Sequence, residues 1–127
     1  MNTLRILLVE DDPMLRRLCS KVFETKGYLT LTAEDGLEGL SKAQKEKPDI
    51  IVLDVMLPKM DGYKVCRILK SDPRTKSIPI ILHTARMEEN QDKVKTESGA
   101  DAFVVKNSNI AELLNTVEAY TTAKSEK

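Results

Sequence analysis

The chain lacks tryptophan, and it has one histidine, two cysteines and an aromatic content of only 4% among its 127 residues. Cys19 and Cys66 both fall within apolar patterns of helical spacing. We therefore interpret them as buried free thiols, for which a reducing cytosol is the natural setting. His83 stands at the end of an apolar segment. Metal or acid–base chemistry usually brings partner residues, so we interpret His83 as structural.

The sequence also has no excess charge of either sign, no long apolar run and no internal repeat. Its 20 basic and 20 acidic residues cancel, whereas a nucleic-acid-binding domain carries a basic excess, so we expect no direct nucleic-acid binding. No segment reaches the length of a membrane span and no signal peptide is recognisable, so we expect no membrane insertion. The length fits one domain over residues 1–127. Within it, residues 121–127 are expected to form a polar tail.

Short apolar segments alternate with longer segments of helical periodicity. The apolar segments predict five strands, at residues 5–9, 28–33, 50–53, 78–82 and 103–105. The third is apolar on both faces, which is typical of a central strand in a parallel sheet covered by helices.

Helices are predicted between these strands and after the last one. The first has Asp12 as its N-cap, Pro13 as its first residue and Gly27 at its end. The others are expected around Leu37 to Ala43, at 62–69, at 87–98, and from Asn109 onward with a capping box. The alternation predicts a doubly wound α/β fold, (βα)5, with a parallel sheet between two helical layers. The fourth helix has few apolar residues, so we expect weak anchoring.

Polar residues follow the predicted strands, at the sheet edge where open parallel sheets bind ligands. They are Asp11 and Asp12, Asp54, Thr84 and Lys106. Each alone has an ordinary explanation as a cap, a loop acid, a turn residue or a surface charge. Their joint position at neighbouring strand ends favours a functional site.

The chemistry of this set is that of phosphoryl transfer. Three carboxylates close together repel one another and need a cation, and hard oxygen ligands suit Mg²⁺. Lys106 and the Thr84 hydroxyl can bind phosphoryl oxygens, and the Asp54 carboxylate is the natural nucleophile.

Several motifs resemble the receiver domain of two-component response regulators over almost the whole chain. They are Leu-Val-Glu-Asp-Asp at 8–12, Asp-Val-Met-Leu-Pro at 54–58 with Asp-Gly at 61–62, Thr-Ala at 84–85, and Gly-Ala-Asp at 99–101 leading to Phe103 and Lys106. Together they are highly specific, although each alone is weak. The resemblance implies a flavodoxin-like fold with strand order 2-1-3-4-5.

The resemblance also implies an activity and a metal site. Asp54 would accept a phosphoryl group from a histidine kinase, a histidine phosphotransfer protein or a small phosphodonor. Asp11 and Asp12 would hold Mg²⁺, together with Asp54 and the backbone carbonyl of Met56. The chain would be a switch that assists its own phosphorylation and dephosphorylation, not an enzyme.

Further roles follow from the same resemblance. Lys106 and the backbone of Ala85 would contact the phosphoryl group. Thr84 would move toward it and Phe103 would follow as the switch aromatic. The surface of the fourth helix, fifth strand and fifth helix would change and contact an output protein. The sequence identifies neither that protein nor the kinase and the stimulus, and no output domain is expected within the chain.

Three positions depart from the family pattern. Asn107 follows the lysine where proline is usual, Ser108 replaces a bulky apolar residue, and His83 replaces an aliphatic one. Because a cis bond before a non-proline residue costs about 3–4 kcal/mol, we expect a trans Lys106–Asn107 bond, with Lys106 still facing the acids.

Two alternative functions remain open. A phosphatase of the haloacid dehalogenase type also uses an aspartate at a strand end, but it has a second acid two residues later, where this chain has Met56. A degenerate receiver that binds partners without phosphorylation is the other alternative, which the altered segment after Lys106 keeps open.

Overall fold

The computed structural model describes residues 3–85, 91–106 and 109–125, and in them strands and helices alternate throughout. The elements are, in chain order, β1 Arg5–Val9, α1 Pro13–Thr25, β2 Leu29–Ala33, α2 Gly36–Glu46, β3 Ile50–Leu53, α3 Gly62–Ser71, β4 Ile80–Thr84, α4 Gln91–Ser98, β5 Ala102–Val105 and α5 Ala111–Ser125. The strands form one sheet in the order β2-β1-β3-β4-β5, and every neighbouring pair is parallel. The predicted fold class and strand order are confirmed.

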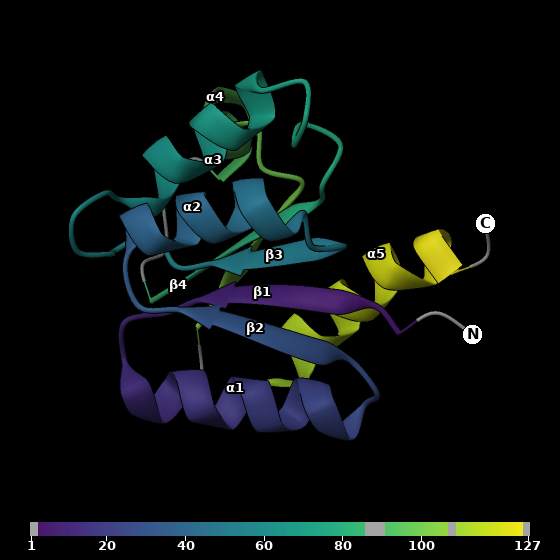
Figure 1. The fold of residues 1–127 in the computed structure, drawn as a ribbon. Helices are drawn as coiled ribbons and strands as arrows, with labels where there is room; N and C mark the ends of the chain where they lie inside the picture. Colours follow the sequence, from purple (N-terminus) through teal and green to yellow (C-terminus); the bar gives the residue numbers. More distant parts are fainter. Residues whose placement is uncertain (1–2, 86–90, 107–108, 126–127) are drawn as a thin grey trace.

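The sheet separates two hydrophobic cores, because successive strand residues point to opposite faces. In β1, Ile6 and Leu8 belong to the core that includes residues of α1 and α5, whereas Leu7 and Val9 belong to the core under α2 and α3. Figure 1 shows α1 on one side of the sheet and α2 and α3 on the other. Strands β1, β3, β4 and β5 each contribute residues to both cores and therefore anchor both helical layers.

The central strand is the most deeply buried element. All four residues of β3 are fully inaccessible, and β1 and β4 flank it. Burial on both faces explains the unbroken apolar run Ile50–Leu53. Asp54 follows directly, so the most buried strand delivers this carboxylate to the sheet edge.

Two strand boundaries differ from the sequence-based expectation. Tyr28 lies outside β2: its ring packs edge-on against Phe23, and its hydroxyl is 2.8 Å from that of Thr121. β4 begins at Ile80, because Pro79 cannot donate to the ladder and the Ile78 N–H closes a turn onto Thr75. The shift places His83 and Thr84 inside the strand.

The expected polar tail at 121–127 is also corrected. Helix α5 continues to Ser125, and Thr121 is buried at 2% exposure with its hydroxyl bonded to the Val117 carbonyl. A small hydroxyl that bonds its own helix backbone can be buried without an unsatisfied group, which a reading of residue polarity misses.

Helix α4 is described from Gln91, and its predicted first turn at 87–90 lies outside the described residues. Val94 is the only α4 residue among the described hydrophobic cores.

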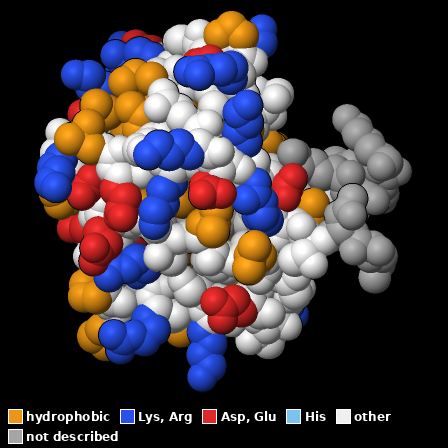
Figure 2. Space-filling view, viewed as in Figure 1, with side chains coloured by type: hydrophobic (Ala, Val, Ile, Leu, Met, Phe, Trp, Pro, Cys, Tyr) orange, Lys and Arg blue, Asp and Glu red, His pale blue; other side chains and the backbone are white. Residues whose placement is uncertain are grey.

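No helix in the described ranges has the length and apolar character that a membrane crossing requires. Basic and acidic side chains are interspersed over the face shown in Figure 2.

Candidate functional site

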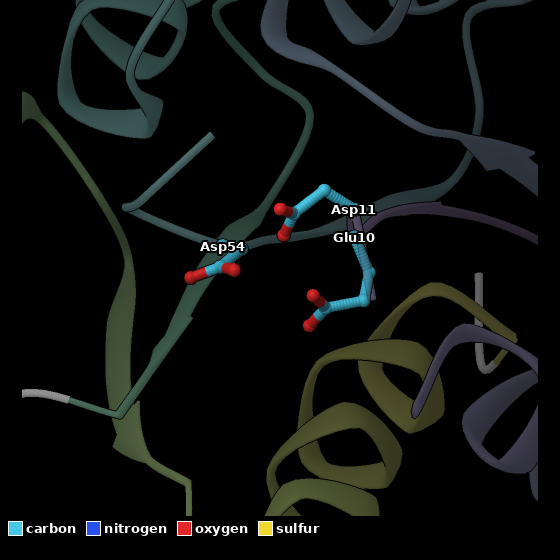
Figure 3. A group of neighbouring side chains, drawn as sticks. All are labelled: Glu10, Asp11 and Asp54. Atoms are coloured by element: carbon cyan, nitrogen blue, oxygen red, sulfur yellow. The ribbon is translucent and has the colours of Figure 1, made fainter. Parts of the chain in front are cut away.

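Three carboxylates from two strand ends face one another at the carboxyl edge of the sheet. Glu10 and Asp11 follow β1, and Asp54 follows β3. One carboxylate oxygen of each lies within 4.8 Å of the others, and Figure 3 shows the three groups pointing into a common space. β1 and β3 are hydrogen-bonded neighbours, so their ends lie side by side.

Lys106, at the end of β5, bridges two of these acids. Its Nζ lies 2.7 Å from Oε1 of Glu10 and 3.0 Å from Oδ2 of Asp54. The Glu10 and Asp54 side chains are only 3% and 6% exposed, so the lysine supplies the cation that makes their burial tolerable. A lysine directed to bulk solvent would have favoured the degenerate-receiver alternative, whereas Lys106 faces the acids.

Burial and pairing shift the pKa values in this cluster. Burial raises the pKa of Glu10 above its usual range, and the hydrogen bonds from Lys106 and from the Asp12 backbone only partly oppose it. Burial alone would lower the pKa of Lys106, but its hydrogen bonds to Glu10 and Asp54 raise it overall. Lys106 is therefore a fixed positive charge at neutral pH.

The sequence predicted that Asp12 would face Asp11 and Asp54, but Asp12 lies outside this group of carboxylates. Glu10 occupies that position instead. The Asp12 side chain caps α1, accepting a 3.0 Å hydrogen bond from the Met14 N–H. Its own N–H donates to Oε2 of Glu10 at 3.1 Å. Glu10 was missed as a site residue, although a signal was present: it immediately follows the last residue of β1.

Asp54 is held on two sides, by β1 and by the loop that follows β3. The Asp54 N–H donates to the Val9 carbonyl at 3.0 Å, and its Oδ1 accepts from the Met56 N–H at 3.2 Å. The Gly62 N–H donates to the Val55 carbonyl at 2.8 Å, which closes the loop at the start of α3. Met56 is 59% exposed, beside the acids.

The remaining predicted site residues lie on β4 and β5. Thr84 is fully buried at the end of β4, paired in register with Val105, and its carbonyl accepts from the Lys106 N–H. Ala85 follows it and is exposed. Phe103 is partly buried against the core under α2 and α3. β4 and β5 thus bring Thr84 and Lys106 to the same sheet edge as the acids.

His83 is 7% exposed, and burial, together with the nearby charge of Lys106, lowers its pKa to about 4. It is therefore neutral at physiological pH, which agrees with the structural role expected for it. Asn107 and Ser108, with the expected trans bond after Lys106, lie outside the described residues.

The donor set suits Mg²⁺. The three side chains offer only hard carboxylate oxygens, with neither the imidazole nor the thiolate that softer metals prefer. Asp11 is exposed, which leaves room for the water ligands that Mg²⁺ usually keeps.

Comparison with known proteins gives consistent relatives. Residues 6–118 match the family described as the response regulator receiver domain. The chain is 42% identical over 116 residues to the DNA-binding dual master transcriptional regulator RpaA of Synechocystis, covering 91% of this chain and 48% of that protein. It therefore spans about half the length of this curated relative.

Solved structures agree with the fold. The chemotaxis protein CheY4 of Vibrio cholerae superposes with a TM-score of 0.86 at 30% identity, covering 94% of this chain and 99% of that one. The response regulator TrrA of Thermotoga maritima, in complex with Mg²⁺-BeF, gives a TM-score of 0.84 at 33% identity, covering 93% and 99%. From its sequence, fold and matched residues, the chain belongs to the receiver domain family of two-component response regulators, whose members are signalling modules phosphorylated on aspartate.

Proposed function

We propose that Asp54 is the phosphoacceptor of this receiver domain. One observation carries the proposal: the buried Asp54 carboxylate is held between the Met56 N–H and the Lys106 ammonium, with Glu10 and Asp11 facing it. The donor would be a phosphohistidine of a histidine kinase or phosphotransfer protein, or a small phosphodonor. An assisting role in the chain's own phosphorylation and dephosphorylation belongs to the same proposal.

With a phosphohistidine donor, an Asp54 oxygen would attack phosphorus. An O–P bond would form, and the P–N bond would break with its electron pair leaving on the imidazole nitrogen. Because hydrogen bonds already orient the Asp54 carboxylate, its side chain needs little rearrangement before it attacks. Lys106 would then exchange contact with the carboxylates for contact with phosphoryl oxygens, and Thr84 and the backbone of Ala85 would contact the others.

Glu10, Asp11 and Asp54 would hold Mg²⁺, with the Met56 carbonyl as a further ligand. When bound, the ion neutralises charge that develops on the phosphoryl oxygens. The Mg²⁺-BeF complex of the Thermotoga relative supports this proposal, as does the set of hard oxygen donors in this chain.

The output surface is proposed to be the face formed by α4, β5 and α5. An open depression of about 640 Å³ lies there, lined by residues that include Lys95, Phe103 and Tyr120. Phe103 thus reaches from the core to this face, so a rearrangement of Thr84 and Phe103 would change the shape of the face.

The free thiols Cys19 and Cys66 support a cytoplasmic setting. Both are buried, and burial raises the pKa of each thiol to about 11.

Intact-mass analysis tests the phosphoacceptor assignment. The chain is incubated with Mg²⁺ and a small phosphodonor, and the wild type is expected to gain one phosphoryl group. Asp54→Asn should gain none while keeping its fold by circular dichroism. Asp12→Asn is the matched control, since asparagine also caps helices well. Equal mass gain in wild type and Asp54→Asn would refute the assignment.

A further inference from the structure

We propose that Arg16 is a positioning residue of the metal site, which aims the Asp11 carboxylate by fixing the backbone on both sides of it. Arg16 lies on α1, outside the group of acids. The inference rests on the proposed function, because it concerns how the three carboxylates are held ready for Mg²⁺.

The contacts of the Arg16 guanidinium lead to this conclusion. Its Nη1 donates to the backbone carbonyl of Glu10 at 2.8 Å and to that of Asp11 at 3.3 Å. Its Nη2 donates to Oε1 of Glu34 at 3.1 Å, in the loop that follows β2. The Arg16 side chain is 18% exposed, so the guanidinium group is largely enclosed by the two loops that it connects.

These two carbonyls belong to the two peptide groups that flank Asp11. Each peptide group is planar, so holding both carbonyls leaves the two backbone torsions of Asp11 little freedom. Those torsions set the direction of the Cα–Cβ bond, and therefore where the Asp11 carboxylate points. A guanidinium suits this task because its donors are fixed in one plane.

Asp11 needs such support more than its neighbours. Lys106 holds the carboxylates of Glu10 and Asp54 directly. Asp11 is exposed, and no hydrogen bond or ion pair with another described residue holds its carboxylate. Its aim therefore depends on the backbone that Arg16 fixes.

Removing Arg16 has two effects of opposite sign on Mg²⁺ binding. Loss of a positive charge near the acids should tighten Mg²⁺ through electrostatics alone. Loss of the backbone contacts should weaken Mg²⁺, because Asp11 must then be ordered by the ion itself; residues that orient metal ligands are worth about 10–100-fold in affinity. The sign of the change separates positioning from simple charge.

Arg17 offers a matched control for charge. It is the next residue of α1 and is exposed, and its side chain has no hydrogen bond or ion pair with another residue in the described ranges. Arg16→Gln and Arg17→Gln remove the same charge one position apart. Calorimetric titration with MgCl2, at a temperature well below the melting temperature of each variant, measures its Kd for Mg²⁺. The melting temperature without metal separately measures any loss of stability.

We expect Arg16→Gln to raise the Mg²⁺ Kd about tenfold, and Arg17→Gln to leave it unchanged or slightly lower. A Kd for Arg16→Gln equal to or below that of Arg17→Gln overturns the inference. If Arg16→Gln does not fold, Arg16→Lys against Arg17→Lys decides by the same criterion, since one ammonium cannot reproduce the fork. A wild type that does not bind Mg²⁺ overturns the proposed metal site as well, whereas normal binding by both wild type and Arg16→Gln overturns only the role of Arg16.

Discussion

The Nζ atom of Lys106 lies 3.0 Å from Oδ2 of Asp54, although 52 positions separate the two residues along the chain. The same ammonium contacts Glu10 at 2.7 Å. Two nearly buried carboxylates therefore share one cation. This arrangement couples the stability of the fold to the chemistry of the site, because whatever removes the lysine leaves two like charges facing each other.

Lys106→Met tests that coupling with a side chain of similar length. Without metal, its free energy of unfolding should fall by about 1–3 kcal/mol, since two buried acids lose their partner. Its rate of phosphodonor-dependent mass gain should fall roughly 10²-fold, as expected when a donor to developing oxyanion charge is lost. Urea unfolding and timed mass spectrometry measure the two effects. Lys93→Met, which removes an exposed lysine of α4, should change neither, and an unchanged rate in Lys106→Met would contradict the assigned role.

The identity of the metal ligands gives a second prediction. Saturating Mg²⁺ should raise the melting temperature of the wild type, with about 2.7 kcal/mol of stabilisation at 100 times the Kd. Glu10→Gln and Asp11→Asn should reduce this gain strongly, whereas Asp12→Asn should keep it, because Asp12 lies outside the group of facing carboxylates. Differential scanning fluorimetry over a MgCl2 series measures all four proteins. A loss of the response in Asp12→Asn alone would restore Asp12 as a ligand in place of Glu10.

The acids after β1 show how far the sequence predicts the site. The strand end, the helix cap at Asp12 and the sheet edge were all predictable from apolar periodicity and capping preference. The choice between Glu10 and Asp12 depends on which way the chain turns after Val9, and the only sequence signal for it was the position of Glu10 directly after the strand. Asp12 could also cap a helix and still reach the acids, so a capping preference alone does not exclude it as a ligand.

The boundaries of β4 and α5 have a similar explanation. Ile78 is apolar and nearly buried, yet its N–H closes a turn instead of joining the ladder. Thr121 is polar, yet it is buried, with its hydroxyl 2.8 Å from that of Tyr28, which precedes β2. The first position is determined by a local turn and the second by a contact between residues 93 positions apart, and local composition contains neither. The strand order followed from the family resemblance and not from periodicity.

A third prediction concerns pH. His83 has its pKa lowered from 6.5 to about 4 by burial and by Lys106. A depressed histidine pKa means that the unfolded chain binds the proton more readily, so stability is complete above pH 6.5 and falls as the pH drops toward 4. The loss over this window should be about 3 kcal/mol. His83→Leu should remove it, and urea unfolding at pH 7, 6, 5 and 4 gives the difference between the two proteins. Parallel curves for the two proteins would show that His83 contributes nothing.

A fourth prediction concerns the proposed output surface. Val94 is the only α4 residue packed into a described core, so the α4 backbone should open readily. Hydrogen exchange over residues 91–98 should change when Mg²⁺ and beryllofluoride, a phosphoryl analogue, are added. Exchange in β3, which is buried on both faces, should stay constant as the internal control. Identical exchange in α4 with and without the analogue would count against the surface.

The last prediction concerns Gly62, the first residue of α3. A Cβ built at this position would lie 2.1 Å from the backbone carbonyl oxygen of Asp54 and 2.9 Å from Cα of Val55. Both are backbone atoms, so rotation of a side chain cannot relieve the contact. Gly62→Ala must instead push α3 away from the loop that carries Asp54 and Met56. We expect a loss of about 1–3 kcal/mol in unfolding free energy.

Gly39→Ala is the matched comparison for this variant. Its Cβ would meet the side chain of Val9 at 2.8 Å, a contact within the core and not with the Asp54 loop. Both variants should lose stability, but only Gly62→Ala should also weaken Mg²⁺ binding and slow phosphorylation, because only there does the nucleophile move away from Lys106 and the other acids. Calorimetry and timed mass spectrometry on both proteins, at a temperature where each is folded, separate the two effects. Equal Mg²⁺ affinity and equal phosphorylation rate in the two variants would show that the close approach of Gly62 to Asp54 serves packing alone.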